Sequence, residues 1–511
     1  MSTTPRRYHA LAGAVAGLSG IAVSHVLTGV LNARATPVQS VAETIIVLTP
    51  GRVAEGFIQL VGQLDKPILI TSVTLAIVGL GAVAGLISRR SGLGANLVFL
   101  AMGALALAAA MSRPGFTPSA LIPLGAGVAT WLVVLTLLAD AVPPPDPPVD
   151  RAESGRSDAS SRRGFLLRAG GFTLAAVALA AGGRFFGRDL RAVESARRLL
   201  RLPVSRGTEP TGAALGVRGT TPWRVPNGSF YRIDTAMVVP VIDPAQWRLR
   251  IHGMVDKELT LTYQDLLERD MTQAWVTLCC VSNPVGGDLI GNAFWSGVRV
   301  ADLLAEAGVS PDADAVLQTS KDGWTCGTPI EALTDDRNSL LALAMNGEPL
   351  PVDHGFPVRM VVPGLYGYVS ATKWVVDLEV TRYDRISAYW TERGWSAKGP
   401  VKTHSRIEVP DNGSEVSAGS VRIGGQAWAQ HTGVAAVEYR LDGNAWEQAE
   451  LGGVPNDDTW AQWAATVELE PGEHTLAVRA TDSSGYTQTS ARADVVPDGA
   501  TGWHTIDVTA S

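Results

Sequence analysis

The sequence has few cysteines and no strong excess of charge of either sign. Its 511 residues include only 3 Cys and carry a formal net charge of −7. Three cysteines in a chain of this length exclude the disulfide framework of a small secreted domain. No Cys-x-x-Cys-His is present, so we expect no covalently attached haem. The mild charge and the lack of a basic-aromatic module argue against a nucleic-acid-binding protein.

What the chain does have is long apolar segments, most of them in its first third. Residues 10–33, 67–87, 93–112 and 118–140 are rich in Ala, Leu, Val and Gly and nearly free of charge. Each is close to the roughly 20 residues that a helix needs to cross about 30 Å of hydrocarbon. Four such segments in succession do not suit the buried helices of a water-soluble protein. We therefore predict an α-helical transmembrane bundle over residues 1–140.

Arginines flank these segments alternately, and the positive-inside rule converts their positions into an orientation. They lie before the first segment, between the second and third, and after the fourth: Arg6, Arg7, Arg89, Arg90, Arg151, Arg156, Arg162 and Arg163. The rule places the N-terminus in the cytoplasm, the loop formed by residues 34–66 outside and the linker formed by residues 141–163 inside. Because residues 141–163 are rich in Pro, Ser and Arg, we predict that they form an unfolded spacer.

A fifth apolar segment, residues 164–183, follows the pair Arg162 and Arg163. With Phe165 and Leu166 shortly after the pair, it resembles an internal twin-arginine export signal. Alternatively, the two arginines only anchor a fifth transmembrane helix. We expect the segment to be retained as an anchor, because four spans precede it. Long folded domains are largely exempt from the positive-inside rule, so residues after 184 are predicted to lie outside the cell membrane.

Two features of the membrane region carry expectations of their own. Residues 184–209 form a basic connector, in which 187–202 suits equally an amphipathic helix on anionic lipid or a plain solvated helix. His25 lies in the middle of the first span, where an ionisable residue is a functional candidate by default. A membrane haem needs two facing histidines, so we expect His25 to be a hydrogen-bonded structural residue.

The rest of the chain divides into two parts with different patterns. Residues 210–395 mix short strand-like and short helical segments, which predicts an α+β domain rather than repeated βαβ units. Residues 396–511 show short alternating strands separated by turn signals such as Asp442-Gly443. Regularly spaced short strands of this kind predict an all-β Ig-like sandwich.

The most informative segment runs from Trp275 to Asp288. An apolar strand-like stretch ends in Cys279 and Cys280, and a Ser-Asn-Pro turn and two glycines follow. This places a soft ligand at the tip of a strand, beside a backbone that a bulky ligand can approach closely. Together with the later segments His354-Gly-Phe-Pro-Val-Arg359 and Lys373-Trp374, it resembles the molybdenum site of the sulfite oxidase family.

The resemblance covers nearly all of residues 220–390 and implies a molybdenum-molybdopterin cofactor. It implies that Cys280 is the metal ligand, and that Cys279, facing the other way on the strand, belongs to packing. It also implies that Arg232 orients the substrate, while basic residues grip the anionic end of the cofactor. The implied cofactor-binding residues are Phe230, Tyr231, Arg232, Asp322, His354, Arg359, Ala371, Thr372 and Lys373.

The chain departs from the family's pattern at two places near the metal. Leu343 and Ala344 stand just before a Met-Asn-Gly segment, where sulfite oxidases have a catalytic tyrosine. Residues 284–286 are Pro, Val and Gly, at positions where the family has arginines. Losing cations that bind an oxyanion puts sulfite itself in doubt and leaves the cofactor site intact. Cys326, close to Asp322 in the sequence, is expected to serve packing.

The leading interpretation is a membrane-anchored molybdenum-pterin oxidoreductase. It would move one oxygen atom and two electrons to or from a small oxo-anion or an S- or N-oxide. Because no haem domain is visible, electrons would pass to a separate partner, a cytochrome or a membrane redox carrier. The C-terminal sandwich resembles the family's dimerisation domain, which implies a homodimer. Two alternatives stay open: a sulfoxide-type reductase of the same superfamily, and a non-catalytic cell-surface binding protein on this fold.

Overall fold

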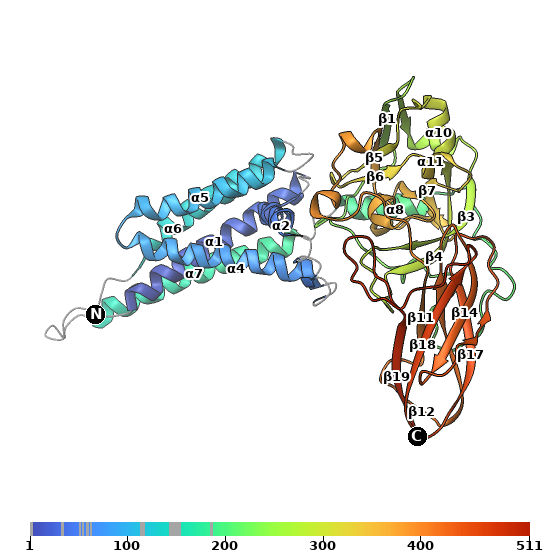
Figure 1. The fold of residues 1–511 in the computed structure, drawn as a ribbon. Coiled ribbons are helices and arrows are strands. Elements are labelled where there is room, and N and C mark those ends of the chain that lie inside the picture. The colour runs from blue at the N-terminus through green and yellow to red at the C-terminus, as the bar shows by residue number, and fades with distance from the viewer. Residues whose placement is uncertain are drawn as a thin grey trace. The chain divides into compact units, whose positions relative to one another are not determined.

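The structure is a computed structural model that describes residues 4–31, 35–50, 53, 56–57, 61, 64–112, 118–142, 155–183 and 188–511. The chain separates into two compact units, Met1–Ala192 and Val193–Ser511, whose ribbons are drawn in Figure 1. The first unit is helical and the second is rich in strands. Each unit has its own hydrophobic core.

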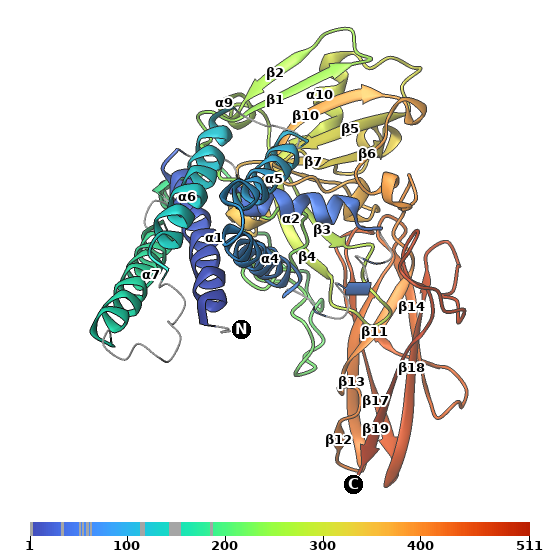
Figure 2. The ribbon, with the colours of Figure 1, turned by 90° about the vertical axis from the view of Figure 1, so that its left-hand side faces the viewer.

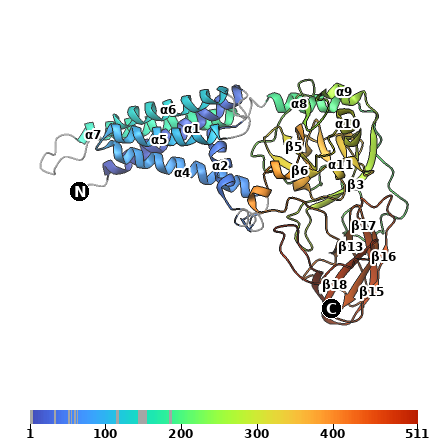
Figure 3. The same cartoon turned by 45° about the horizontal axis from the view of Figure 1, so that its top comes forward.

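The first unit is a bundle of apolar helices that run alongside one another (Figure 3). Its helices are α1 (Thr4–Val30), α2 (Pro37–Leu48), α4 (Asp65–Ser88), α5 (Gly92–Met111), the short η2 (Pro118–Ala120), α6 (Leu121–Ala139) and α7 (Gly155–Gly183). Five segments are long and apolar enough to cross a membrane: Arg6–Val30, Asp65–Ser88, Gly92–Met111, Pro118–Ala139 and Arg162–Ala181. The five apolar helices predicted from the sequence are therefore confirmed as helices.

Two details of this unit differ from the predictions. Helix α2 lies within residues 34–66, which were expected to be a loop. Helix α7 begins at Gly155, so the end of the predicted unfolded spacer is helical, while residues 143–154 lie outside the described residues. His25 is exposed, and none of the hydrogen bonds among the described residues includes its ring, so the expected hydrogen-bonded structural role stays a prediction. A helical period of 3.6 decides which side a residue faces, and His25 falls on the outer side of α1.

Helix α1 is the centre of the bundle, because it packs against α4, α6 and α7. Glycines allow the α1 and α4 backbones to touch: a Cβ on Gly13 would lie 1.9 Å from the carbonyl oxygen of Gly81. Small residues of this kind let membrane helices approach closely. Near one end of the same contact, the ring of His9 is 3.2 Å from the Ser88 hydroxyl. On another side of α1, the rings of Tyr8 and Phe165 meet edge to face at 5.0 Å.

The second unit begins with two five-stranded sheets and a few short helices, as predicted for an α+β domain. One sheet has the order β2-β1-β10-β5-β6 and the other the order β3-β4-β7-β8, with β9 beside β7 (Figure 2). The strands are β1 (Arg248–Gly253), β2 (Leu259–Thr262), β3 (Thr272–Cys279), β4 (Ile290–Arg299), β5 (Ala315–Ser320), β6 (Thr325–Pro329), β7 (Leu340–Met345), β8 (Glu348–Pro349), β9 (Arg359–Val361) and β10 (Val375–Thr381). The helices are α8 (Arg188–Leu199), α9 (Tyr263–Leu267), α10 (Val300–Ala307) and α11 (Glu331–Thr334).

Strand β3 is the element that carries the two adjacent cysteines. It is buried from Ala274 onwards on both faces, because one face meets the α+β core and the other meets the C-terminal domain. A strand buried on both faces reads as a continuous apolar run, which explains the sequence Trp-Val-Thr-Leu-Cys. Strand β4 pairs with β3 antiparallel, with Cys279 opposite Ile290. The chain between them, residues 280–289, is therefore a closed loop at the strand tip.

The C-terminal part is a sandwich of two antiparallel-rich sheets, which confirms the predicted Ig-like fold. The sheet orders are β11-β13-β17-β16 and β12-β19-β18-β14-β15. The strands are β11 (His404–Val409), β12 (Glu415–Val416), β13 (Gly419–Trp428), β14 (Val434–Leu441), β15 (Glu447–Gln448), β16 (Glu450–Leu451), β17 (Ala461–Leu469), β18 (Gly472–Asp482) and β19 (His504–Ala510). Inward-facing residues such as Ile423, Val437, Trp463 and Leu476 form its core.

Helix α8 lies within the basic connector predicted for residues 184–209, and one of its faces is buried. Val193 is buried in the core of the second unit, and Arg197 donates a hydrogen bond to the Pro349 carbonyl oxygen at 3.0 Å. Arg198, on another side of the helix, is largely exposed. One face of this helix therefore packs against the α+β domain, so it is not solvated all round.

Candidate active site

Cys280 lies directly after strand β3, with its backbone held by the loop that follows. Its amide donates a hydrogen bond to the Leu289 carbonyl oxygen at 2.9 Å, and its own carbonyl accepts from Asn283 at 3.1 Å. The Asn283 side chain accepts a further bond from the Leu289 amide at 2.9 Å. These three bonds close the loop on itself. The loop therefore sets the position of the Cys280 backbone.

The two adjacent thiols have different surroundings. Cys279 is 2% exposed and lines a gap, without room for a water molecule, beside Tyr366, His404 and Trp428. Burial, and then the neighbouring Cys280, raise the pKa of the Cys279 thiol well above its usual value. Cys280 is 9% exposed and is the more accessible of the two. This arrangement agrees with packing for Cys279 and leaves Cys280 as the candidate ligand.

Phe230 and Tyr231 reach the same place from a distant part of the chain. The ring of Phe230 lies against Gly291, where a Cβ would come within 2.7 Å of it. It also meets the His354 ring edge to face at 5.7 Å. Burial, followed by the charges of Cys280 and Cys279, raises the pKa of Tyr231 well above its usual value, while Arg359 opposes the change. Tyr231 is therefore close to both thiols and to the guanidinium.

Arg359 is the most unusual charge of the site. Its side chain is buried, its Nε and Nη1 donate to the carbonyl oxygens of Met360 and His354 at 3.2 Å, and its guanidinium lies 5.0 Å from the Trp295 ring. Burial lowers its pKa to about 10. Among the ion pairs of the residues that the structure describes, none includes Arg359. A buried guanidinium without a carboxylate partner is costly, and an anion would compensate it.

Two further basic side chains stand beside Arg359. His354 donates from Nε2 to the Asn227 carbonyl oxygen at 3.2 Å, and burial followed by the charges of Arg359 and Lys373 lowers its pKa to about 3. Lys373 is paired with Asp234 at 2.9 Å, yet burial lowers its pKa to about 8. We call Arg359, His354 and Lys373 the cation cluster. The charges of Arg359 and Lys373 repel each other, and burial together with these charges keeps the His354 imidazole neutral near pH 7. The cluster therefore favours an anionic ligand such as a phosphate group.

Arg232 is held at the side of the cation cluster. It forms ion pairs with Asp234 at 3.0 Å and with Asp353 at 3.2 Å, and Asp234 is the partner of Lys373 as well. Its side chain is 39% exposed. Within the described residues, none of its polar contacts joins it to Cys280. The substrate-orienting and cofactor-binding roles predicted for Arg232 both stay predictions.

The remaining predicted residues lie around the cluster. Lys321, next to Asp322, donates its amide to the Trp374 carbonyl oxygen at 2.8 Å, which brings the β5–β6 turn beside Lys373. The Thr372 hydroxyl bonds the buried Gln318 side chain at 2.5 Å and is 3.3 Å from the Cys326 sulfur. Ala371 donates its amide to the Gly367 carbonyl oxygen at 3.0 Å. Cys326 is fully buried and burial raises its pKa to about 12, which suits the expected packing role.

One interpretation of the Cys280 loop needs correction. The glycines at 286 and 287 were expected to open the backbone to a bulky ligand. A Cβ on Gly286, which has φ +80°, would lie 2.3 Å from Nε2 of His504, and one on Gly287 would lie 2.5 Å from the Pro284 ring. The glycines are therefore required by the close approach of the C-terminal domain and by packing within the loop. Antiparallel strands far along the chain decide this, so no local pattern reveals it.

Sequence reasoning also missed Asp234, Trp295 and Asn227. Asp234 neutralises Lys373 and Arg232, Trp295 lies under Arg359, and Asn227 holds His354. Asp234 and Asn227 lie within a few residues of Phe230, Tyr231 and Arg232, and this closeness in the sequence could have indicated that they belong to the site. Trp295 gave no signal, because it reads as an ordinary apolar residue of a buried strand.

Comparisons with known proteins find relatives of both domains of the second unit. The model of the oxidoreductase molybdopterin binding domain matches residues 236–390, and that of a bacterial Ig domain matches residues 405–478. An uncharacterised oxidoreductase of Bacillus subtilis, YuiH, is 33% identical over 35% of this chain and 87% of its own length. The mitochondrial sulfite oxidase of Mus musculus is 31% identical over 51% of this chain and 56% of its own length. The chain thus spans about half the length of that sulfite oxidase. The crystal structure of the sulfane dehydrogenase SoxCD from Paracoccus pantotrophus is 25% identical, covering 62% of this chain and 92% of that chain with a TM-score of 0.49.

Proposed function

The chain belongs to the sulfite oxidase family of molybdopterin-dependent oxidoreductases, and on this premise we propose that it transfers an oxygen atom and two electrons to or from a small oxo-anion or an S- or N-oxide. The protein is an enzyme, and its cofactor is molybdenum-molybdopterin. Its N-terminal helices have the length and apolar character of a membrane anchor.

The observation that carries the proposal is the buried, uncompensated charge of Arg359. Together with the Lys373 ammonium and the neutral His354 imidazole, it forms the cation cluster, which suits the anionic end of the cofactor. The Cys280 thiol, at the tip of β3, offers the soft anionic donor that molybdenum takes. When bound, the cofactor supplies the metal that exchanges two electrons and an oxygen atom with the substrate. The chain's own part is to hold the anionic end, present the thiolate and exclude water around Tyr231 and Phe230.

A second candidate is the reduction of an uncharged sulfoxide by the same site. It is favoured by the composition of residues 281–289, which contain no lysine or arginine and one acidic residue, Asp288. This loop offers no positive charge that would attract an anionic substrate, and the Asp288 carboxylate would repel one. A neutral oxide experiences no such repulsion. Two kinds of substrate are therefore proposed. An anion would be oriented by Arg232, whereas a neutral oxide would be oriented by the metal alone.

The bundle supports a catalytic domain on the outer side of the cell membrane. Tyr8 contacts Phe165 and His9 contacts Ser88, so the starts of α1 and α7 and the end of α4 lie together. That end of the bundle carries Arg6, Arg7, Arg89, Arg90, Arg162 and Arg163. The positive-inside rule assigns such an end to the cytoplasm, so α7 would lead outward to the second unit.

Helix α7 suits a retained anchor rather than a cleaved signal. Phe165, two residues after Arg163, is fully buried and its ring meets Tyr8 of α1, and Ala169 and Ala176 are buried as well. A helix packed into the bundle in this way resists removal. Twin-arginine export remains part of the proposal, as do a separate cytochrome or membrane redox carrier for the electrons and a homodimer through the C-terminal sandwich.

The proposal is tested by the molybdenum content of detergent-purified protein from a host that makes the cofactor. We expect about one molybdenum per chain in the wild type, a changed metal absorption spectrum in Cys280→Ala, and wild-type behaviour in Cys279→Ala. Cys326→Ala is the matched control for loss of a buried thiol. Absence of molybdenum from the wild type would overturn the proposal and bring the binding-protein alternative to first place.

A further inference from the structure

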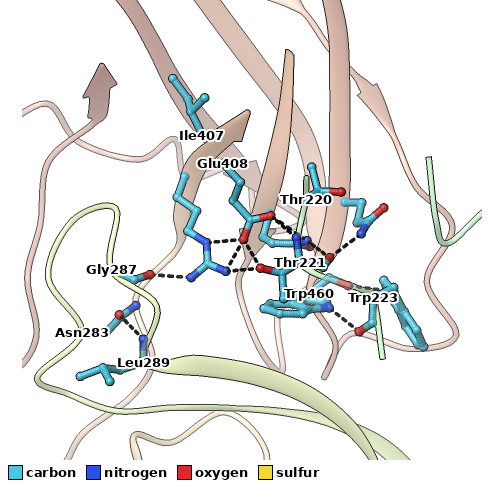
Figure 4. Close-up of polar contacts among 12 residues, drawn as sticks. Thr220, Thr221, Trp223, Asn283, Gly287, Leu289, Ile407, Glu408 and Trp460 are labelled. Atoms are coloured by element: carbon cyan, nitrogen blue, oxygen red, sulfur yellow. Dashed lines mark hydrogen bonds and ion pairs between the residues drawn. The ribbon is translucent and has the colours of Figure 1, made fainter. Parts of the chain in front are cut away.

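The loop that carries Cys280 is contacted by two residues of the C-terminal sandwich. Arg406, on strand β11, donates from Nη1 to the Gly287 carbonyl oxygen at 2.5 Å, as Figure 4 shows at the Gly287 label. His504, on strand β19, lies directly over Gly286. Two consecutive residues of the loop are thus contacted by two strands that lie more than a hundred residues further along the chain.

Arg406 is itself fixed by a dense set of buried partners. Its Nε donates to Glu408 Oε1 at 2.9 Å and its Nη2 also pairs with that oxygen. Glu408 in turn accepts bonds from the amide and the hydroxyl of Thr221 at 2.8 and 2.6 Å. The Thr221 carbonyl oxygen accepts from the side chains of Gln426 and Gln462 at 2.9 and 2.8 Å. Arg406 therefore has little freedom to move away from Gly287.

A short series of hydrogen bonds within the loop connects Gly287 to the backbone of Cys280. Gly287 donates its amide to the Pro284 carbonyl oxygen at 2.9 Å, and Leu289, two residues on, accepts the bond from the Cys280 amide. Asn283 joins both ends of the loop through its backbone and side chain. A shift of Gly287 would therefore move Leu289 and with it the backbone that carries the thiol.

We propose that Arg406 of the C-terminal sandwich is a positioning residue for the Cys280 loop. Held by Glu408 and Thr221, it fixes the Gly287 carbonyl and thereby the direction of the Cys280 thiol, while His504 blocks the loop from moving toward the sandwich. The proposal assigns the sandwich a part in the chemistry of the site, beyond any role in dimer formation. It rests on the proposed function of Cys280 as the metal ligand.

The buried ion pair of Arg406 and Glu408 suits a role in positioning the loop better than a role in stabilising the fold. The side chains of Arg406 and Glu408 are 5% and 10% exposed. A buried ion pair is weak evidence of a gain in stability, because removing two charges from water is costly. A guanidinium, however, donates several hydrogen bonds in a fixed plane and can hold a carboxylate and a carbonyl oxygen together. Lysine offers no such fixed geometry, which makes the conservative variant informative.

The test compares Arg406→Gln and Arg406→Lys with Arg479→Gln in the full-length holoenzyme. Arg479 lies in the same sandwich and pairs with Glu438 at 2.8 Å, without a polar contact to residues 281–289 in the described chain. The first readout is amide hydrogen exchange over residues 280–289. The second is the electron paramagnetic resonance spectrum of partly reduced, molybdenum-loaded protein. Molybdenum content and the melting temperature are recorded for each variant.

In Arg406→Gln we expect exchange at 280–289 to rise by roughly tenfold or more, because opening no longer breaks a charged hydrogen bond. The resonance spectrum of Arg406→Gln should also change. In both readouts Arg406→Lys should lie between the wild type and Arg406→Gln, and Arg479→Gln should match the wild type. Equal exchange and equal spectra in Arg406→Gln and Arg479→Gln would overturn the inference. The two proposals fail separately: a wild type without molybdenum refutes the proposed function, and the exchange readout then still decides whether Arg406 positions the loop.

Discussion

Trp223 and Trp460 exchange hydrogen bonds across the boundary between the α+β domain and the sandwich. The Trp223 indole donates to the Trp460 carbonyl oxygen at 3.1 Å, and the Trp460 indole donates to that of Trp223 at 2.8 Å (Figure 4). Both side chains are about 1% exposed or less, in one hydrophobic core with strand β3. The two domains therefore share a core, which gives the sandwich a fixed position relative to the Cys280 loop.

The shared core predicts that the two domains unfold together. Trp460→Ala should lower stability by about 3–5 kcal/mol, because a large buried ring and its hydrogen bond are both lost. Scanning calorimetry of the detergent-purified protein should show one transition for both domains, shifted to lower temperature. Trp446→Ala, on the partly exposed Trp446–Trp503 pair of the sandwich, is the control and should cost less. Two separate transitions in the wild type would contradict the prediction.

Replacing Arg359 by Met should separate cofactor binding from stability. We expect molybdenum occupancy to fall by about tenfold or more, because a charged, geometrically suited donor to the cofactor's anionic end is lost. The cofactor-free form should be no less stable than the wild type, since an uncompensated buried charge is removed. Metal analysis and melting curves of the cofactor-free proteins check both parts. Full occupancy in Arg359→Met would show that this guanidinium does not hold the cofactor.

The protein should lose stability in mild acid through His504. Burial, and then the charge of Arg406, lower the pKa of His504 from 6.5 to about 4. Between these values the folded protein binds fewer protons than the unfolded one, so stability falls as the pH falls through this window. The contribution lost at pH 5 is at most about 2 kcal/mol. Denaturant melts at pH 7 and pH 5 should show a smaller loss for His504→Asn than for the wild type, and an equal loss would refute the assignment.

The orientation of the bundle can be tested by labelling single added cysteines in intact cells. The three native cysteines are buried, which keeps the background low. Ser420→Cys, exposed on the sandwich, should react with a membrane-impermeant maleimide, whereas Ser91→Cys, beside Arg89 and Arg90, should react only after lysis. Labelling of Ser91→Cys in intact cells, with Ser420→Cys protected, would reverse the proposed orientation.

The local parts of this protein could be predicted from its sequence. Runs of apolar residues as long as Gly92–Met111 predict helices that suit a bilayer, and the alternation around Asp442-Gly443 predicts the sandwich. Both follow from periods of 3.6 and 2, which neighbouring residues reveal directly. The resemblance to a known family added Cys280, His354 and Arg359 as candidates. In the fold Arg359 bonds the His354 carbonyl, and Tyr231 lies close to both Cys280 and Arg359.

What only the tertiary structure decided are the partners that lie far apart in the sequence. Arg232 was assigned to both the substrate and the cofactor, and only the structure shows its ion pairs with Asp234 and Asp353 beside the cation cluster. The glycine at 286 was assigned to a ligand, yet His504 occupies the space beside it. The sequence alone determined which residues are candidates for the chemistry, because their types and order are written in it. Which side chain meets which depended on how strands β3, β11 and β19 pack, since such contacts arise only when separate segments share one core.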